Sequence, residues 1–315
     1  MMPESPKSAG KAASSAAGTS LRPRLNPAMA CDTAFRIIAR HCLADLAANQ
    51  PATCEGDPAA LHRMRIALTR LRTAIVFFSP MVADRQLPQI RRELKWLNTH
   101  LGVVRDLDVA VERLRAAGNG DRSALQSRAR NDHARLTRTL RSARCRRLVD
   151  GTSTWVENGS WSTTRRKRAA RIRALPIAAY SDDKLARWQH KLLNKSRKLA
   201  RMCGKRRHQL RLKTKRLNYS VEFFEGLFPG KIHSRQQTAL KHLRKAQKSL
   251  GQLNDDARGR SLATDSGSSL RLLAPKHRKR LIKATAKAYR KLAALKPAFR
   301  PGPKEIPVEE ARFSY

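Results

Sequence analysis

Acidic and aromatic residues are scarce in this chain of 315 residues, and each shortage narrows the classes of function. Phe, Trp and Tyr make up only 5% of the sequence, so base stacking, a main source of affinity for single-stranded nucleic acid, is poorly provided for. Asp and Glu number 24 against 67 Lys and Arg, which leaves a formal net charge of +43. This excess is far beyond what solubility requires and implies a polyanionic partner.

Cysteine pairs and long apolar runs are missing as well. The five cysteines form no CxxC pair and have no histidine at zinc-finger spacing, so we expect reduced thiols and no metal site. No stretch of 18 apolar residues occurs, and the N-terminus lacks the continuous apolar segment of a signal peptide. We therefore expect a cytoplasmic protein that is neither secreted nor membrane-spanning.

Motifs of catalysis are also absent. The chain has no GxxxxGK[ST], HExxH or GxSxG motif, and no acidic run that could hold the metals of a phosphoryl-transfer site. Asp106 and Asp108 resemble a carboxylate pair, with Asp255 and Asp256 as a second copy, but ion pairs with nearby cations explain them more simply. We expect no enzyme activity, no catalytic residue and no cofactor.

Helical periodicity recurs between two tails of low complexity, at residues 1–27 and 296–315, and no alternating strand pattern occurs. The class is therefore all-α. Two sets of four helices are expected, separated by a basic linker at 150–181, and four helices form a unit of bundle size. The first half, 28–149, has helices at 28–50, 58–79, 85–117 and 121–149; the second, 182–295, has them at 182–203, 205–226, 233–263 and 268–295.

An internal repeat links the two halves. The segment HRMRIALTRLRTAIVFF from His62 matches HQLRLKTKRLNYSVEFF from His208, and LKWLNTHLGVVRD from Leu94 matches LRKAQKSLGQLND from Leu243. In the first pair the apolar residues are spaced by four, three, four and three, which predicts a core-facing stripe on a helix. The match predicts two four-helix bundles of long antiparallel helices, related by internal pseudo-twofold duplication.

Each copy of the repeat carries a basic helix face. His62, Arg65, Thr69 and Arg72 are spaced by three, four and three, so they lie on one face, and His208, Arg211, Lys215 and Asn218 repeat it. Charge runs usually face water, but neither copy has an acid at i, i+4 from its basic residues to offset them, which favours phosphate binding. The candidate polyphosphate-binding residues are His62, Arg63, Arg65, Arg70, Arg72, Lys95, Arg105, His208, Arg211, Lys213, Lys215, Arg216 and Arg244.

A glycine recurs on the next helix of each half. Lys95, Asn98, Gly102 and Arg105 lie at helical spacing, and Arg244, Gln247, Gly251 and Asn254 repeat them. Glycine costs a helix about 1 kcal/mol relative to alanine, so its presence in both copies suggests a close approach. A packed helix is the favoured cause, and a ligand is the alternative.

These motifs resemble the CHAD family, whose first half has the pattern H-x-x-R-[VI]-x-x-R-R-x-R followed by LGxxRDxDV. Here the first pattern stands from His62 to Arg72 and the second from Leu101 to Val109. The second half is similar to the family's H-x-x-R-[IL]-x-x-K-[KR]-L-R-Y, from His208 to Tyr219, with LGxxND from Leu250. Thr69 and Asn218 replace two expected arginines and remove one cation from each half. The resemblance covers about residues 28–295.

The resemblance implies two bundles around a basic cleft that binds inorganic polyphosphate and places the protein on polyphosphate granules. The ExExK motif of relatives fused to a triphosphatase is absent, so binding alone is implied. Histidines that become cationic below about pH 6.5 would tighten binding at mildly acid pH. Nucleic acid is expected as a weaker competitor. Two alternatives stay open: a nucleoid or RNA-associated protein that uses its tails and residues 165–173, and a scaffold at storage granules.

Overall fold

The computed structural model describes residues 24–116, 123–228, 230–266 and 274–295, and within them the chain is helical, with no strand. The predicted all-α class is confirmed. Most of the two predicted tails, and the first residues of the last predicted helix, lie outside the described residues. The first helices are α1 (Cys31–Ala48), α2 (Gln50–Cys54), α3 (Pro58–Phe77), α4 (Ser79–Val82), α5 (Leu87–Ala116), α6 (Ser123–Arg141) and α7 (Ala143–Asn158). They are followed by α8 (Lys167–Ala174), α9 (Ile177–Ser196), a 3-10 turn η1 (Leu199–Arg201), α10 (Gly204–Phe223), α11 (Lys231–Ser266) and α12 (Pro275–Ala294).

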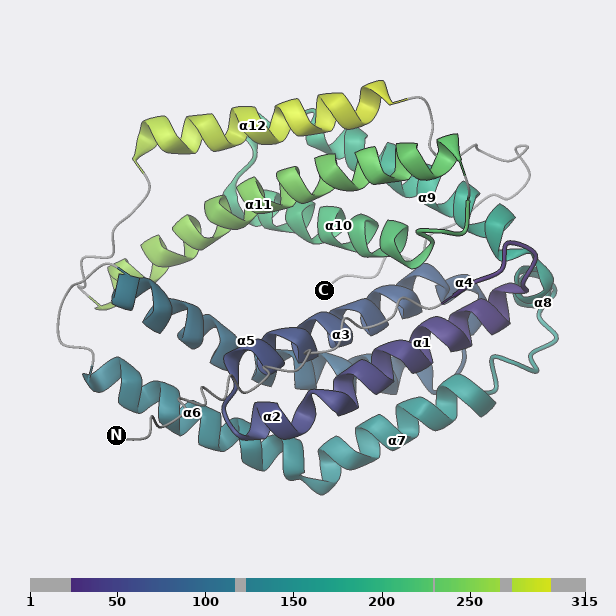
Figure 1. The fold of residues 1–315 in the computed structure, drawn as a ribbon, viewed down its shortest axis with the longest axis horizontal. Helices are drawn as coiled ribbons and strands as arrows, with labels where there is room; N and C mark the ends of the chain where they lie inside the picture. The colour runs from purple at the N-terminus through teal and green to yellow at the C-terminus, as the bar shows by residue number, and fades with distance from the viewer. Residues whose placement is uncertain (1–23, 117–122, 229, 267–273, 296–315) are drawn as a thin grey trace, which may run out of the picture.

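The helices form two groups, and α3 of one group and α10 of the other face each other between them (Figure 1). In the first group α1 packs on α3, α3 on α5, and α5 on α6 and α7. In the second group α10 packs on α9 and α11, and α12 covers α11 on its outer side. Helix α3 contacts α10 directly, so the two sequence-matched helices lie side by side at the centre of the molecule.

Local sequence signals explain where α3 begins and ends. The Asp57 side chain accepts a hydrogen bond from the backbone N–H of Ala59 at 2.7 Å, and Pro58 occupies the first turn, where its missing N–H costs nothing. At the other end α3 stops at Phe77, and Pro80 lies in the first turn of the short helix α4 that follows. The predicted range 58–79 therefore differs from the observed helix by two residues.

The predicted core stripes are buried on both matched helices. On α3 the stripe from Met64 to Phe78 is at most 1% exposed, and on α10 the corresponding stripe from Leu210 to Phe224 is at most 2% exposed. Thr214, the polar residue in the second stripe, is also buried. Its hydroxyl bonds to the Leu210 carbonyl at 2.8 Å and to the Tyr289 hydroxyl at 2.6 Å, so the polar atom is satisfied inside the core.

Aromatic side chains join the two groups of helices. Phe77 lies 5.1 Å from Phe224 and 5.7 Å from Tyr180, measured between ring centroids. The Tyr180 hydroxyl donates to the Phe77 carbonyl at 3.0 Å, and burial raises the pKa of this phenol. One apolar cluster therefore extends across the junction and holds α3 and α10 in fixed register.

The fourth predicted helix and the linker after it need correction. Residues 121–149 were expected as one helix, but α6 ends at Arg141 and Ser142 caps a new helix, accepting from the Cys145 N–H at 3.2 Å. Helix α7 then continues to Asn158, through the first part of the predicted linker at 150–181. The basic run at 165–173 is largely the helix α8 rather than an open linker.

The cysteines are unpaired, as their spacing predicted. Cys31, Cys42, Cys54, Cys145 and Cys203 are all free thiols. Among the described residues, no helix is long and apolar enough to cross a membrane.

Candidate functional site

The basic face of α3 is held in place by contacts with α5. Arg65 is 26% exposed at its side chain, and its guanidinium donates to the Gly102 carbonyl at 3.2 Å and lies 3.6 Å from the Asp106 carboxylate. Thr69, one turn on, bonds back to the Arg65 carbonyl at 2.8 Å. Because α5 supplies both partners, Arg65 is oriented by the neighbouring helix rather than left to move freely.

The matching face of α10 makes parallel contacts with α11. His208 Nδ1 lies 2.7 Å from Asn254 Oδ1. The Arg211 guanidinium lies over Gly251, 3.7 Å from the position that a Cβ atom would take there. Lys215 has its ammonium 5.6 Å from the centre of the Tyr219 ring, one turn along the same helix. The histidine and arginine of α10 thus lie against α11, as Arg65 of α3 lies against α5.

Electrostatic effects show that the two faces come together. Burial, and then the charges of Arg211, Arg65 and Arg72, lower the pKa of Lys215 to about 8. The pKa of His62 is lowered as well, first by burial and then by the positive charges of Arg105, Lys215, Arg65 and Arg63. Each shift includes cations from the opposite group of helices, so one concentrated positive region spans α3, α5 and α10. We call it the central basic cluster and define it as His62, Arg65, Arg72, Arg105, Arg211 and Lys215.

Two aromatic residues flank the central basic cluster. The Arg70 guanidinium lies 5.6 Å from the centre of the Phe223 ring, so this α3 residue packs on α10. Burial and the nearby Glu222 carboxylate raise the pKa of Tyr219 to about 12, while Arg70, Arg211 and Arg65 act in the opposite direction. Tyr219 therefore keeps its proton and can act as a hydrogen-bond donor beside the cations.

Other predicted residues lie around this centre in different settings. Arg63 turns toward α2, with its Nε 2.7 Å from Asn49 Oδ1. Lys95 is exposed on α5, and Lys213 and Arg216 are half-buried on α10. Lys213 lies two residues from both Arg211 and Lys215, so helical geometry puts it on another side of α10.

Glu222 was not singled out from the sequence, yet it organises one edge of the site. Its carboxylate accepts from Asn218 Nδ2 at 2.9 Å and from Arg244 at 3.0 Å. Asn218 is only 3% exposed and is hydrogen-bonded to this carboxylate. The same carboxylate partly neutralises the charge of Arg244. The available signal was the i, i+4 spacing between Asn218 and Glu222.

The preferred explanation for the repeated glycines was wrong. A Cβ atom on Gly102 would meet nothing within 4 Å, and one on Gly251 would meet only the Arg211 guanidinium, at ordinary contact distance. Neither glycine is needed for close packing between helices. Both instead leave helix backbone bare beside an arginine of the site.

Three of the four acidic residues singled out in the repeats contact basic side chains. Asp106 pairs with Arg65, Asp108 Oδ1 lies 2.7 Å from His133 Nε2, and Asp256 lies 3.5 Å from Arg278. Within the described ranges, no three His, Cys, Asp or Glu side chains group as a metal site needs.

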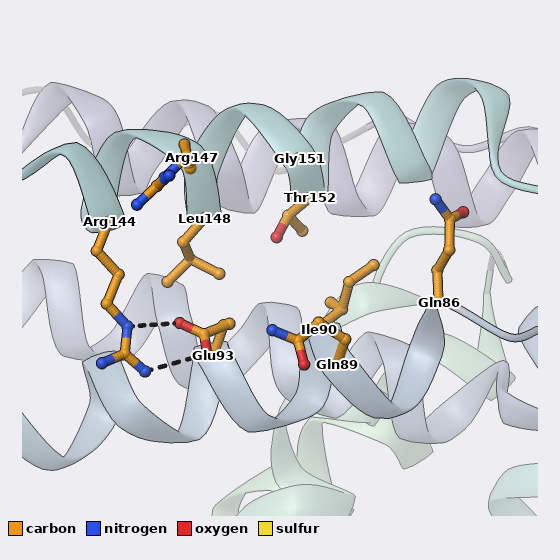
Figure 2. Close-up of a pocket in the computed structure, with 9 residues that line it drawn as sticks. All are labelled: Gln86, Gln89, Ile90, Glu93, Arg144, Arg147, Leu148, Gly151 and Thr152. Carbon is orange, nitrogen blue, oxygen red and sulfur yellow. Dashed lines mark hydrogen bonds and ion pairs between the residues drawn. The ribbon is translucent and has the colours of Figure 1, made fainter.

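A hollow lies away from the cluster, between the first half of α5 and α7 (Figure 2). It has a volume of about 520 Å³ and is crossed at one end by the bidentate pair of Arg144 and Glu93, at 2.9 and 3.1 Å. That pair lowers the pKa of Glu93, so the one carboxylate of the lining is already matched by a cation. None of the predicted site residues lines this hollow.

Comparison with known proteins now places the fold. The family model described as the CHAD domain matches residues 37–264, which is most of the chain and includes both basic helices. This chain belongs to the CHAD domain family. No curated protein matches it.

Two solved structures support the CHAD assignment at the level of the fold. The crystal structure of the CHAD domain from the plant Ricinus communis is similar with a TM-score of 0.67 and 25% identity, covering 88% of this chain and 97% of that one. PptA from Streptomyces chartreusis is similar with a TM-score of 0.53 and 15% identity, covering 86% and 98%. At that identity the second likeness shows the fold alone.

Proposed function

We propose that this CHAD protein binds inorganic polyphosphate, without catalysis, through the central basic cluster, and that this binding places it on polyphosphate granules. The observation that carries the proposal is the gathering of cations from α3, α5 and α10 where these helices pack together, in which burial and then the neighbouring charges lower the pKa values of His62 and Lys215. Cations that destabilise one another in the free protein gain most from a ligand that neutralises several of them together. A chain of phosphates, with about one charge each, is such a ligand.

Unsatisfied donors support the same ligand. Within the described residues, Arg70 Nε and Arg211 Nε are buried without a hydrogen-bond partner. A buried donor without a partner costs about 1–3 kcal/mol. Arginine binds phosphate oxygens in a bidentate manner, so a modest rotation of either guanidinium onto a phosphate would satisfy these atoms.

The shape and composition of the site favour polyphosphate over nucleic acid. Tyr219 and Phe223, the aromatic residues beside the cations, are half-buried and buried, and Phe223 is occupied by Arg70. Base stacking requires exposed rings, whereas a phosphate chain needs only cations and bare backbone. The family membership points the same way, because the resemblance to CHAD domains implies polyphosphate binding.

A competition experiment tests the proposal. The purified protein is titrated with labelled polyphosphate at about 0.15 M ionic strength, with DNA and RNA as competitors. The test variant changes Arg65, Arg72, Arg211 and Lys215 to Gln. The control variant removes the same number of charges from exposed positions on α6, at Arg128, Arg130, Arg138 and Arg141.

We expect wild type and the α6 variant to prefer polyphosphate and the cluster variant to lose that preference while staying helical by circular dichroism. The slope of log affinity against log salt should become shallower by about 0.7–0.9 for each phosphate that the cluster variant no longer neutralises. Equal competition by nucleic acid, together with unchanged binding by the cluster variant, would refute the proposal and favour a nucleic-acid-binding protein.

A further inference from the structure

A second strongly basic surface lies on α12, on the outer side of the molecule. This helix has eight Lys and Arg residues and no Asp or Glu in 20 residues. A surface helix of the same length in this chain, α9, carries four Lys and Arg together with Asp182 and Asp183. The charge of α12 is therefore offset by fewer acidic residues than that of its neighbour α9.

Packing directs these cations outward. Leu281, Ala288, Tyr289 and Leu292 are buried against the second group of helices, with Thr285 between them. The remaining positions include six exposed cations: Lys279, Arg280, Lys283, Lys287, Arg290 and Lys291. Arg278 of α12 is paired with Asp256 of α11, at 3.5 Å. No ion pair is observed for the six exposed cations within the described residues.

Helix α11 extends this surface. Lys241 and Lys245 are exposed on α11, and together with Lys291 of α12 they surround His242. Burial and these three ammonium groups lower the pKa of His242, which shows that the cations of both helices lie close together. The outer surface is thus a strip across two helices rather than a single row.

This strip is separate from the central basic cluster. Helix α12 packs on α11, on α9 and on η1, and α11 lies between it and the junction where α10 meets α3 (Figure 1). A ligand bound at the cluster therefore does not occupy the strip. The two basic surfaces are therefore distinct places on the molecule.

The strip is suited to an extended phosphate chain. From Lys276 to Lys291 the helix rises about 22 Å, at 1.5 Å per residue, with cations repeating every three or four residues. Tyr289, the aromatic residue of α12, is only 3% exposed, so the strip offers no ring on which a base could stack.

We propose that the outward face of α12, with Lys241 and Lys245 of α11, is a second polyphosphate-binding surface, so that one molecule joins two polyphosphate chains. This inference rests on the proposed function of the central basic cluster and adds to it. A protein with two such surfaces links chains to one another and would condense polyphosphate rather than only coat it.

A sandwich-binding experiment tests the linkage. Biotinylated polyphosphate is immobilised, the protein is bound and the surface is washed, and then fluorescent polyphosphate is added as the probe. The strip variant changes Lys279, Lys283, Lys287 and Arg290 to Gln, which has similar helix propensity. The α6 variant is the control for removal of four charges, and light scattering gives the mass of each protein in solution.

We expect wild type and the α6 variant to capture the probe. The strip variant should bind the immobilised chain nearly as well as wild type but capture about tenfold less probe. If wild type binds no immobilised chain, the proposed function itself fails. If it binds that chain without capturing the probe, or if the strip variant captures the probe as well as wild type does, the second surface is disproved. Preferential capture of labelled DNA, abolished in the strip variant, would also overturn it and assign the strip to nucleic acid.

Discussion

Lys215 is a buried cation of the central basic cluster, and its protonation is expected to respond to a bound polyanion. Its pKa is lowered to about 8 by burial and by Arg211, Arg65 and Arg72, so a fraction of the molecules already has a neutral Lys215 near pH 8. A bound phosphate chain favours the charged form and raises this pKa. Binding therefore takes up a proton, and affinity must fall as the pH rises through the pKa of the free protein.

We expect wild-type affinity for polyphosphate to fall by about tenfold between pH 7 and pH 9, if binding returns the pKa of Lys215 to its ordinary value. In Lys215→Arg the cation stays charged over this range, so the profile should be nearly flat. The measurement is a polyphosphate titration at constant ionic strength from pH 6 to 9.5. A profile of equal slope in both proteins would show that Lys215 does not contact the ligand.

The environment of His62 changes the prediction, made from the sequence, that binding tightens at mildly acid pH. Burial and the surrounding cations lower its pKa, so it remains neutral to a lower pH than an exposed histidine. Ligand binding opposes this shift, so affinity should rise as the pH falls toward the lowered pKa of His62 in the free protein, and the gain is complete only below that pKa. Near neutral pH we therefore expect the pH dependence of binding to come from Lys215 rather than from His62.

At the scale of helices, Gly102 can be tested against Gly151, a glycine in a similar helical setting outside the proposed site. Both lie inside helices, and a Cβ atom on either would meet nothing within 4 Å. Alanine favours a helix by about 1 kcal/mol over glycine, so Gly102→Ala and Gly151→Ala should each raise the free energy of unfolding by up to about that amount. Only Gly102 lies beside Arg65, through its carbonyl, so only its substitution should weaken polyphosphate binding.

Urea unfolding and polyphosphate titration of the two variants check this expectation. If Gly102→Ala is stabilised and binds as wild type does, the bare backbone of α5 is not part of the site. If it is destabilised, the open space beside Gly102 is filled in solution.

Helix positions were predictable where the chain carries strong local signals. Asp57, Pro58 and Pro80 bracket α3, and the sequence predicts that helix within two residues. The break between α6 and α7 has no proline or glycine to mark it. Ser142 caps α7 through a hydrogen bond that depends on how the chain turns, and a serine alone does not distinguish a cap from a position inside a helix.

The candidate site was predictable in composition but not in arrangement. Helical spacing put His62, Arg65 and Arg72 on one face, and the same spacing places Lys213 on another side of its helix. The pairing of α3 with α10 depends on contacts between residues more than 130 positions apart, such as Phe77 and Phe224, and periodicity does not specify which helices pair. For the same reason the tie between Glu222 and Arg244, which lie on different helices, could not be predicted.

At the scale of the whole molecule, the net charge of +43 opposes folding, and part of that repulsion is concentrated in the central basic cluster. A ligand that binds only the folded state stabilises it by about 2.7 kcal/mol at 100 times its Kd. For a domain of this size such a gain raises Tm by roughly 5 °C or more. Simple salt only screens the repulsion between the cations, so it should raise Tm by less than polyphosphate does.

The cluster variant separates ligand stabilisation from general screening. Replacing Arg65, Arg72, Arg211 and Lys215 with Gln removes mutually repelling charges, so its Tm without ligand should not fall below that of wild type, and polyphosphate should no longer raise it as strongly. Scanning calorimetry with polyphosphate, and with orthophosphate at the same phosphate concentration, tests both points. If polyphosphate raises the Tm of both proteins equally, positive charge anywhere on the molecule is enough for this stabilisation. If the rise in Tm is lost in the variant, the stability of the fold depends on ligand bound at the central basic cluster.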